Sequence, residues 1–301
     1  SLREATVEIL SKNVVGHRKL KSYTGCANHV ANLLFAWRPF LDTLWAASSG
    51  TSVNKAPHIR KKPWPLQRKK QKKSRSPKGT VWVNQVRTSL LWILCFLDQL
   101  QGPLSRTWDL HYFYEAALIL TLVLDASPWG LGGVLFEGDS PVAFFSSVLT
   151  KDDEKIHHHR IGEHEGQQLW ECLSVLVALK AWLQFWSQRR LSVAIQSDNL
   201  SALYMAARMK SKASPLINKE IALIYSRASF EPRFVEHIPG IANSLADGLS
   251  RLYEPDSDYV LPEALSNLTP TPLPRRNRSY YDSLSAKQVG RRGKGKNKGY
   301  R

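Results

Sequence analysis

The sequence predicts an α/β protein built on a five-stranded mixed sheet flanked by helices, preceded by a small helical segment and followed by a disordered basic tail. Two features of the chain predict this fold. Three strand-length apolar runs follow one another between residues 116 and 148, and helical and strand patterns alternate after them. The 301 residues are 43% hydrophobic and 10% aromatic. That composition supplies a core and excludes a wholly disordered chain.

The first 115 residues are predicted to be mainly helical. Residues 1–47 form a helical segment in which four apolar residues share one side: Val30, Leu33, Leu34 and Trp37. Residues 48–79 are rich in Ser, Pro, Lys and Arg and read as a basic linker. Residues 80–115 contain a further helix, over 81–100, and the approach to the sheet.

Residues 116–254 are predicted to hold the sheet. An antiparallel meander is indicated by three apolar runs separated by turn residues, at 116–124, 130–136 and 142–148. A polar loop at 151–165, which includes His157, leads into a long helix at 167–187. The remaining elements are a strand at 191–196, helices at 199–209 and 215–229, a strand at 233–237 and a last helix at 241–252.

The net charge of +17 is concentrated in two segments. Residues 60–78 carry 10 basic residues and no acid, and residues 275–301 carry 10 against Asp282 alone. The two segments indicate a polyanion such as nucleic acid as a partner, although solvated disorder or a nuclear-import signal explains them equally well. Because Pro, Ser, Gly and Lys become frequent after Asp256, we expect residues 255–301 to form a low-complexity tail with little fixed structure.

The cysteines and apolar runs indicate an intracellular protein, nuclear or cytoplasmic. Cys26, Cys95 and Cys172 contain no C-x-x-C pair and leave one cysteine over, which argues against a disulfide framework or a zinc knuckle. No apolar run reaches the roughly 18 residues of a membrane span, so no membrane partner is expected. The chain starts with Ser1 rather than Met and is interpreted as part of a longer protein.

Four acidic residues occupy positions at which carboxylates serve chemistry. Asp125 and Asp198 each follow a buried strand, and if those strands are parallel neighbours both carboxylates emerge at one edge of the sheet. Glu171 is the only acid in an otherwise apolar helix, where an uncompensated charge is costly. Asp247 lies on the last helix, after the loop that carries His237.

Four carboxylates at one sheet edge require a divalent cation to offset their repulsion. Oxygen ligands select Mg²⁺ or Mn²⁺ over zinc, and two such ions promote phosphodiester hydrolysis. Each acid taken alone is equally compatible with a cap or a surface role; Asp198, for example, precedes a helix that it would cap. The joint placement of the four acids therefore carries the prediction of two Mg²⁺ ions, with Mn²⁺ as an alternative and no small-molecule cofactor.

Four segments in order resemble the ribonuclease H domain of retroelement polyproteins, closest to gypsy-like and DIRS-like reverse transcriptases. They are VLDASPWGLGGVLF, LWECLSVLVALKAW, VAIQSDNLSALY and HIPGIANSLADGLSRL. Together they span roughly residues 116–252, and the resemblance implies a ribonuclease H-like fold. Upstream, HRKLKSYTGCANHVANLL and RPFLDTLWAA resemble the thumb and connection that follow a polymerase palm. The aromatic-x-Asp-Asp turn of the palm itself does not occur in the chain.

The resemblance assigns roles to individual positions. Its metal-binding and catalytic quartet falls on Asp125, Glu171, Asp198 and Asp247. His237 matches the mobile-loop histidine that assists proton transfer or product release, and an ordinary strand-end histidine is the alternative interpretation. Ser127 and Asn199, which neighbour two of the acids, are candidates for contact with ribose or phosphate, and turn formation explains them nearly as well.

The function expected from the resemblance is hydrolysis of the RNA strand of an RNA·DNA hybrid by a metal-dependent endonuclease. Its expected partners are the hybrid and the palm region of the same reverse transcriptase polyprotein. One alternative is an inactive nucleic-acid-binding remnant of a retroelement. An integrase or transposase core is a further alternative, but such a core uses a glutamate after the middle strands, and Glu171 comes earlier.

Overall fold

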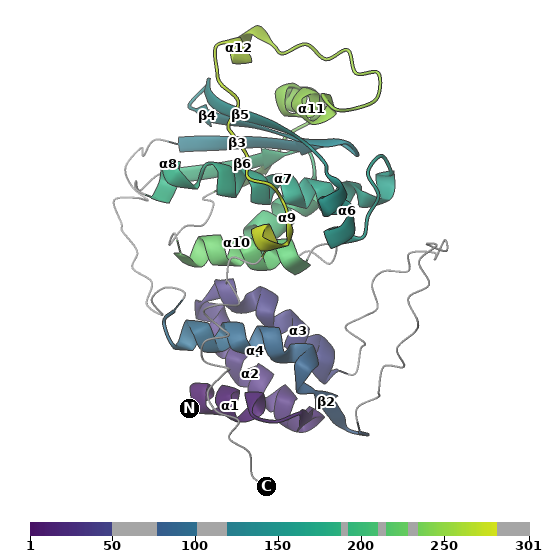
Figure 1. Cartoon of the computed structure of the whole chain (residues 1–301). Helices are drawn as coiled ribbons and strands as arrows, with labels where there is room; N and C mark the ends of the chain where they lie inside the picture. Colours follow the sequence, from purple (N-terminus) through teal and green to yellow (C-terminus); the bar gives the residue numbers. More distant parts are fainter. Residues whose placement is uncertain (50–76, 101–118, 188–191, 210–214, 228–233, 282–301) are drawn as a thin grey trace, which may run out of the picture. The chain divides into compact units, whose positions relative to one another are not determined.

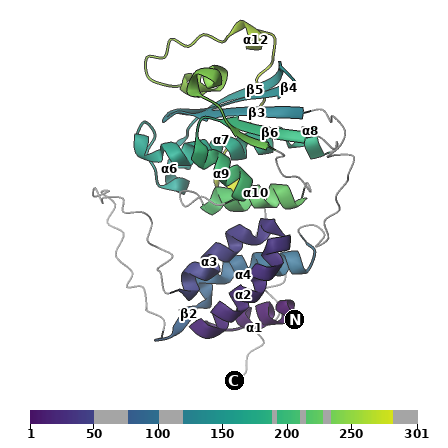
Figure 2. The same cartoon turned by 180° about the vertical axis from the view of Figure 1, so that it is seen from behind.

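The computed structural model divides the chain into two compact units, Ser1–Leu104 and Ser105–Arg301 (Figures 1 and 2). It describes residues 1–49, 77–100, 119–187, 192–209, 215–227 and 234–281. Most of the predicted basic linker, the approach to the sheet at 101–115 and the tail after residue 281 lie outside the described residues. None of the described helices is long and apolar enough to cross a membrane.

The first unit is a small body that contains the helices predicted within residues 1–47 and 81–100. Its helices are α1 (Leu2–Leu10), α2 (His17–Leu33), α3 (Arg38–Ser48) and α4 (Val83–Leu97), with a 3₁₀ turn η1 at Phe35–Trp37. Aromatic side chains fill its centre, with the rings of Phe40 and Trp92 5.2 Å apart. Two three-residue strands, β1 (Val14–Gly16) and β2 (Thr80–Trp82), pair antiparallel and were not predicted. Strands this short leave no readable alternation in a sequence.

The predicted apolar side of the second helix is wrong. Leu33 is 80% exposed, whereas the residues that α2 buries are Leu20, Tyr23, Thr24, Ala27 and Ala31. The cause is that α2 ends at Leu33, so the four expected residues do not belong to one helix. The last of them, Trp37, is buried but belongs to the 3₁₀ turn η1. The true buried face contains alanine and threonine, which carry a weak hydrophobic signal.

The second unit contains the predicted five-stranded mixed sheet, in the order β5-β4-β3-β6-β7. Strands β3 (Ile119–Ala126), β4 (Gly130–Glu137) and β5 (Ser140–Val148) form the antiparallel meander. Strand β6 (Ser192–Ser197) then runs parallel to β3, and β7 (Phe234–His237) runs parallel to β6. The condition for bringing Asp125 and Asp198 to one edge is thereby met.

Helices cover both faces of this sheet (Figures 1 and 2). One face carries α7 (Gln167–Ala181), α8 (Leu183–Ser187), α9 (Leu200–Arg208) and α10 (Pro215–Arg227). The predicted single helix at 167–187 is divided at Trp182, a fully buried residue whose indole donates to Thr271 Oγ1. The other face carries α11 (Ser244–Arg251), which follows the 3₁₀ turn η3 (Gly240–Asn243).

Two glycines of β4 let α11 lie close to the sheet. A Cβ atom on Gly132 would stand 2.2 Å from the carbonyl oxygen of Ala246, and one on Gly130 would stand 2.5 Å from that of Ser250. Real Cβ atoms do not approach so closely, so a side chain at either position would displace the helix. Gly130 and Gly132 therefore set the distance between α11 and β4, the strand that pairs with β3 at Asp125.

The polar loop predicted at 151–165 is partly wrong, because residues Lys151–His157 form helix α6. Thr150 caps this helix through a reciprocal pair of hydrogen bonds with Asp153, a pattern visible in the sequence as a capping box. The structure also half-buries His157, which was expected at the surface. Its ring packs edge-on against Trp170 and Tyr281, and burial lowers its pKa to about 4.

The disordered tail predicted from residue 255 is wrong as far as Tyr281. Residues 255–281, called the strap below, include α12 (Glu263–Ser266) and the 3₁₀ turn η4 (Arg278–Tyr281). Leu265 is fully buried in a cluster with Val134, Phe144 and Leu249, and the amide of Thr271 donates to Phe144 O. The strap was predicted as disordered because proline, serine and basic residues dominate its composition, and the few side chains that anchor it give no periodic pattern.

Candidate metal centre

Two parallel strands bring two aspartates to the same edge of the sheet. The register that pairs Val123 of β3 with Gln196 of β6 continues to place Asp125 beside Asp198. Glu171 lies on α7, which packs against β3. The three acids therefore come from three elements, and the strand ends determine where two of them meet.

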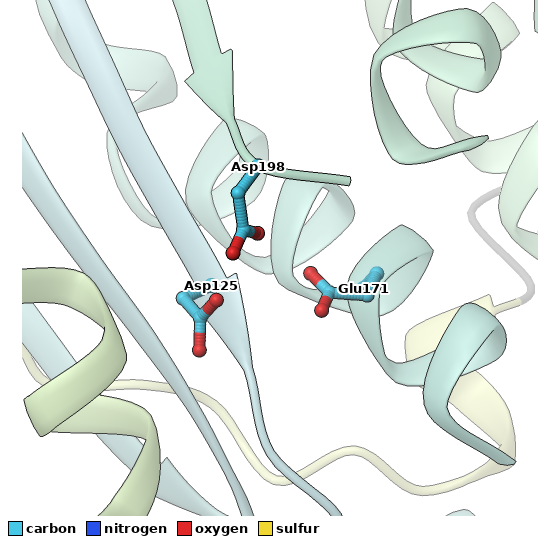
Figure 3. A group of neighbouring side chains, drawn as sticks. All are labelled: Asp125, Glu171 and Asp198. Atoms are coloured by element: carbon cyan, nitrogen blue, oxygen red, sulfur yellow. The ribbon is translucent and has the colours of Figure 1, made fainter. Parts of the chain in front are cut away.

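The three carboxylates form a single cluster, in which one oxygen from each lies within 4.8 Å of the others. Figure 3 shows the side chains of Asp125, Glu171 and Asp198 pointing toward one another. Asp125 and Glu171 are each only 4% exposed, whereas Asp198 is exposed to solvent. The predicted gathering of these three acids is confirmed, and the cluster has one open side at Asp198.

Asp125 is held by two side chains from the other face of the sheet. The hydroxyl of Ser250 on α11 donates to its Oδ2 at 2.6 Å. The amide of Asn243 donates to its Oδ1 at 3.3 Å and to the carbonyl oxygen of Leu124 at 3.2 Å. Both donors are fully buried, so the orientation of the Asp125 carboxylate is fixed by packed elements.

Glu171 is held through its Oε1. The amide of Gln167, one helical turn earlier, donates to its Oε1 at 2.9 Å and also to the carbonyl oxygen of Ala126. Its second oxygen, Oε2, is buried without a hydrogen-bond partner among the described residues. A buried carboxylate oxygen without a partner is costly unless a ligand supplies the missing interaction.

The electrostatics of the cluster are those of a site that needs a cation. Burial, opposed by the Ser250 hydroxyl and assisted by Asp198 and Asp247, raises the pKa of Asp125 to about 7. Burial and the neighbouring Asp125 carboxylate raise the pKa of Glu171 well above its ordinary value. Both shifts have the same origin, since two ionised carboxylates would share a poorly hydrated pocket.

The cluster fits a divalent metal ion with oxygen ligands. Mg²⁺ binds oxygens at about 2.1 Å, so opposite ligands of an octahedral ion stand roughly 4.2 Å apart. Separations of up to 4.8 Å between the three carboxylate oxygens are close to that requirement. The unpartnered Glu171 Oε2 would gain a ligand bond, and the charge would offset the repulsion between the acids. The identity of the metal follows only from the preference of hard oxygens for Mg²⁺ or Mn²⁺.

Asp247, the fourth predicted ligand, is placed differently. It lies outside the three-carboxylate cluster, and its Oδ1 accepts from the guanidinium of Arg251 at 2.7 Å. It is nevertheless near enough to Asp125 to contribute to the raised pKa of that group. The structure thus brings three of the four predicted ligands together and places the fourth close by in an ion pair.

The other predicted site residues lie around the cluster. His237 is exposed at the end of β7, with its Nε2 3.0 Å from the carbonyl oxygen of Asp198. Asn199 caps α9, since its Oδ1 accepts from the amides of Ser201 and Ala202. Ser127 is buried; its hydroxyl donates to Ser250 O and accepts from two amides of the β3–β4 turn. A turn role accounts for the two bonds that Ser127 accepts, and a cap role accounts for the bonds that Asn199 accepts.

Sequence reasoning missed three residues that support the cluster: Gln167, Asn243 and Ser250. Each stands at helical spacing from a predicted ligand, since Gln167 precedes Glu171 by one turn, and Asn243 and Ser250 flank Asp247 by one turn on either side. That spacing was a readable signal. The direction of the last two contacts was not, because they reach Asp125 rather than Asp247.

Comparison of the chain with protein-family models, with curated proteins and with solved structures gives no match. The conclusions about the site therefore depend on its geometry and on the sequence motifs.

Proposed function

We propose that this chain is a metal-dependent endonuclease that hydrolyses the RNA strand of RNA·DNA hybrids, as the ribonuclease H part of a retroelement reverse transcriptase polyprotein. The observation that carries the proposal is the cluster of Asp125, Glu171 and Asp198 at the edge of a mixed sheet. The order of the four sequence motifs around these acids supports this class of nuclease over other metal hydrolases.

The three acids of the cluster differ in burial, and this difference suggests a separate role for each side of the site. Asp125 and Glu171, both buried, would hold a divalent ion from the protein side, and exposed Asp198 would hold it on the side open to substrate. When bound, Mg²⁺ supplies a polarised water and charge stabilisation for the departing oxygen of a phosphodiester. His237, which lies beside Asp198 and is exposed to solvent, would pass a proton at that edge.

Hybrid specificity would come from contacts with the 2′-hydroxyl of the RNA strand and from the shape of the hybrid. The basic linker and tail would add affinity by binding phosphates without reading bases. The polymerase palm of the same polyprotein is the proposed protein partner, because two sequence segments of the first unit resemble the thumb and connection that follow a palm.

The test is cleavage of a labelled RNA·DNA hybrid by the full chain in Mg²⁺, compared between the parent and the variants Asp125→Asn and Asp198→Asn. We expect each variant to lose more than about 100-fold in rate, which exceeds the loss typical of residues that only support a metal ligand. Asp139→Asn is the matched control, since Asp139 is exposed in the β4–β5 turn, at the opposite end of the sheet from Asp125.

Three outcomes would count against the proposal. Cleavage that survives Asp125→Asn or Asp198→Asn would overturn the site assignment. Equal cleavage of single-stranded RNA would overturn the hybrid specificity. Hybrid binding by the parent without cleavage in either Mg²⁺ or Mn²⁺ would support the alternative of an inactive nucleic-acid-binding remnant.

A further inference from the structure

Of the three clustered carboxylates, Asp125 accepts hydrogen bonds from two side chains, and neither donor belongs to the cluster. Each of its oxygens accepts one hydrogen bond, Oδ1 from Asn243 and Oδ2 from Ser250. A carboxylate offers about four lone-pair positions, so two remain for other partners. The two donors therefore leave room for a metal ion while they restrict rotation of the carboxylate.

The Ser250 hydroxyl has one proton and two acceptors within reach. Asp125 Oδ2 lies at 2.6 Å and the carbonyl oxygen of Asp247 lies at 2.8 Å. An ionised carboxylate is the stronger acceptor, since hydrogen bonds to charged oxygens are shorter and stronger than neutral ones. The proton of Ser250 therefore goes to Asp125 whenever Asp125 is ionised, which is the state that binds a metal.

Ser250 is itself held from the strand side. The hydroxyl of Ser127 donates to the carbonyl oxygen of Ser250 at 2.8 Å and accepts from the amides of Trp129 and Gly130, both at 3.1 Å. A continuous chain of contacts thus runs from the β3–β4 turn through Ser127 and Ser250 to Asp125. All three side chains are buried, so water does not compete for these bonds.

Asn243, like Ser250, is a buried polar residue whose side chain bonds to Asp125. It precedes α11, yet its side chain makes no capping bond to that helix. Its amide instead spans the main chain of Leu124 and the side chain of Asp125. A residue at a helix start that forgoes capping in order to bond a distant strand indicates a role at that strand.

The elements that carry the donors are rigidly placed. Gly132 admits the backbone of α11 onto β4, and the ring of Tyr259 from the strap lies where a Cβ atom on Gly248 would be. Leu249 joins the buried cluster that includes Leu265. Helix α11 is thus packed from the sheet below and from the strap above, which fixes Ser250 relative to β3.

We propose that Ser250 and Asn243 are positioning residues for a divalent metal at Asp125, and that Ser127 acts through Ser250 in the same device. This inference rests on the proposed function, since it concerns the same metal site. The physical reason is preorganisation: a ligand already held in its binding orientation loses little freedom when the ion arrives.

The test measures Mn²⁺ affinity of the metal-free full chain from the electron paramagnetic resonance signal of free Mn²⁺. Ser250→Ala and Asn243→Ala are each expected to weaken binding about 10- to 100-fold, the range for residues that support a metal ligand. Ser127→Ala, which acts one contact further away, is expected to weaken it less. In hybrid cleavage, Ser250→Ala should need proportionately more Mn²⁺ for half-maximal rate and should approach the parent rate at saturation.

Two control variants separate positioning from a loss of stability. Ser244→Ala changes an exposed serine at the start of the same helix and should leave the affinity unchanged. Phe145→Leu opens space beside Trp182 and should lower the melting temperature without changing the affinity. If Ser250→Ala does not fold, Asn243→Ala and Ser127→Ala still carry the test.

The outcomes distinguish this inference from the proposed function. Parent affinity in both Ser250→Ala and Asn243→Ala would overturn the positioning role and leave the metal site intact. A fall in affinity for Phe145→Leu as large as that for Ser250→Ala would also overturn it, because the effect would then be general. A parent chain that binds no Mn²⁺ would overturn the proposed metal site and the positioning role together.

Discussion

Replacement of Arg276 by methionine is predicted to destabilise the second unit strongly. Arg276 lies on the strap and is 4% exposed, and its partner Asp153 on α6 is fully buried. The guanidinium donates to both carboxylate oxygens, at 2.9 to 3.2 Å. It also donates to Ser147 Oγ and Val148 O, both at 2.6 Å. One side chain thus joins the strap to α6 and to strand β5.

The magnitude follows from what the substitution leaves behind. Methionine would fill much of the volume, but Asp153 would remain as a buried charge with only neutral donors, from Thr150 and Tyr281. Breaking a buried ion pair on one side costs about 3–5 kcal/mol. Typical domains have a free energy of unfolding of about 5–15 kcal/mol, so this is a large fraction of the total.

The assay is urea unfolding of the full chain, followed by tryptophan fluorescence and circular dichroism, with the transition of each unit fitted separately. Arg275→Met is the matched control, because Arg275 is 79% exposed and pairs with Asp152 at the surface. Such surface pairs contribute at most about 1 kcal/mol. If Arg276→Met costs no more than Arg275→Met, the strap is not held by this ion pair and the reasoning is wrong.

Two further predictions concern the metal centre and the helix that supports it. The folded state raises the pKa of Asp125 to about 7. Between about pH 4 and pH 7 the Asp125 carboxyl is therefore protonated in the folded chain and ionised in the unfolded chain. The contribution of Asp125 to the free energy of unfolding therefore falls between about pH 4 and 7, so metal-free Asp125→Asn should melt above the parent at pH 8; a lower melting temperature there would contradict this. Gly132→Ala should cost about 1–3 kcal/mol in urea unfolding, since its Cβ meets the backbone of α11. Gly25→Ala, with nothing within 4 Å and a helical backbone, should be neutral or stabilising, and equal effects of the two would refute the close-approach argument.

The core of the fold was predictable because its signals are local. Each central strand is a continuous apolar run bounded by turn residues, and the acids at 125 and 198 stand where such runs end. Glu171 is conspicuous as a lone acid in a buried helix. These features need no knowledge of distant contacts.

The parts that were missed depend on contacts between distant residues. Ser250 reaches Asp125 across 125 positions, and Asn243 reaches it across 118. Arg276 reaches Asp153 across 123 positions, which is why the strap resembled a disordered tail. Helix α6 is a different case, because the capping box of Thr150 and Asp153 was readable and was overlooked.

Location of the metal tests the central claim most directly. Crystals of the full chain grown in Mn²⁺ and measured at an anomalous wavelength should show a peak among the carboxylates of Asp125, Glu171 and Asp198, at about 2 Å from their oxygens. Crystals of the Asp198→Asn variant, grown and measured in the same way, should show a weaker peak or none. Manganese bound elsewhere in the parent, with that position empty, would contradict the existence of the site.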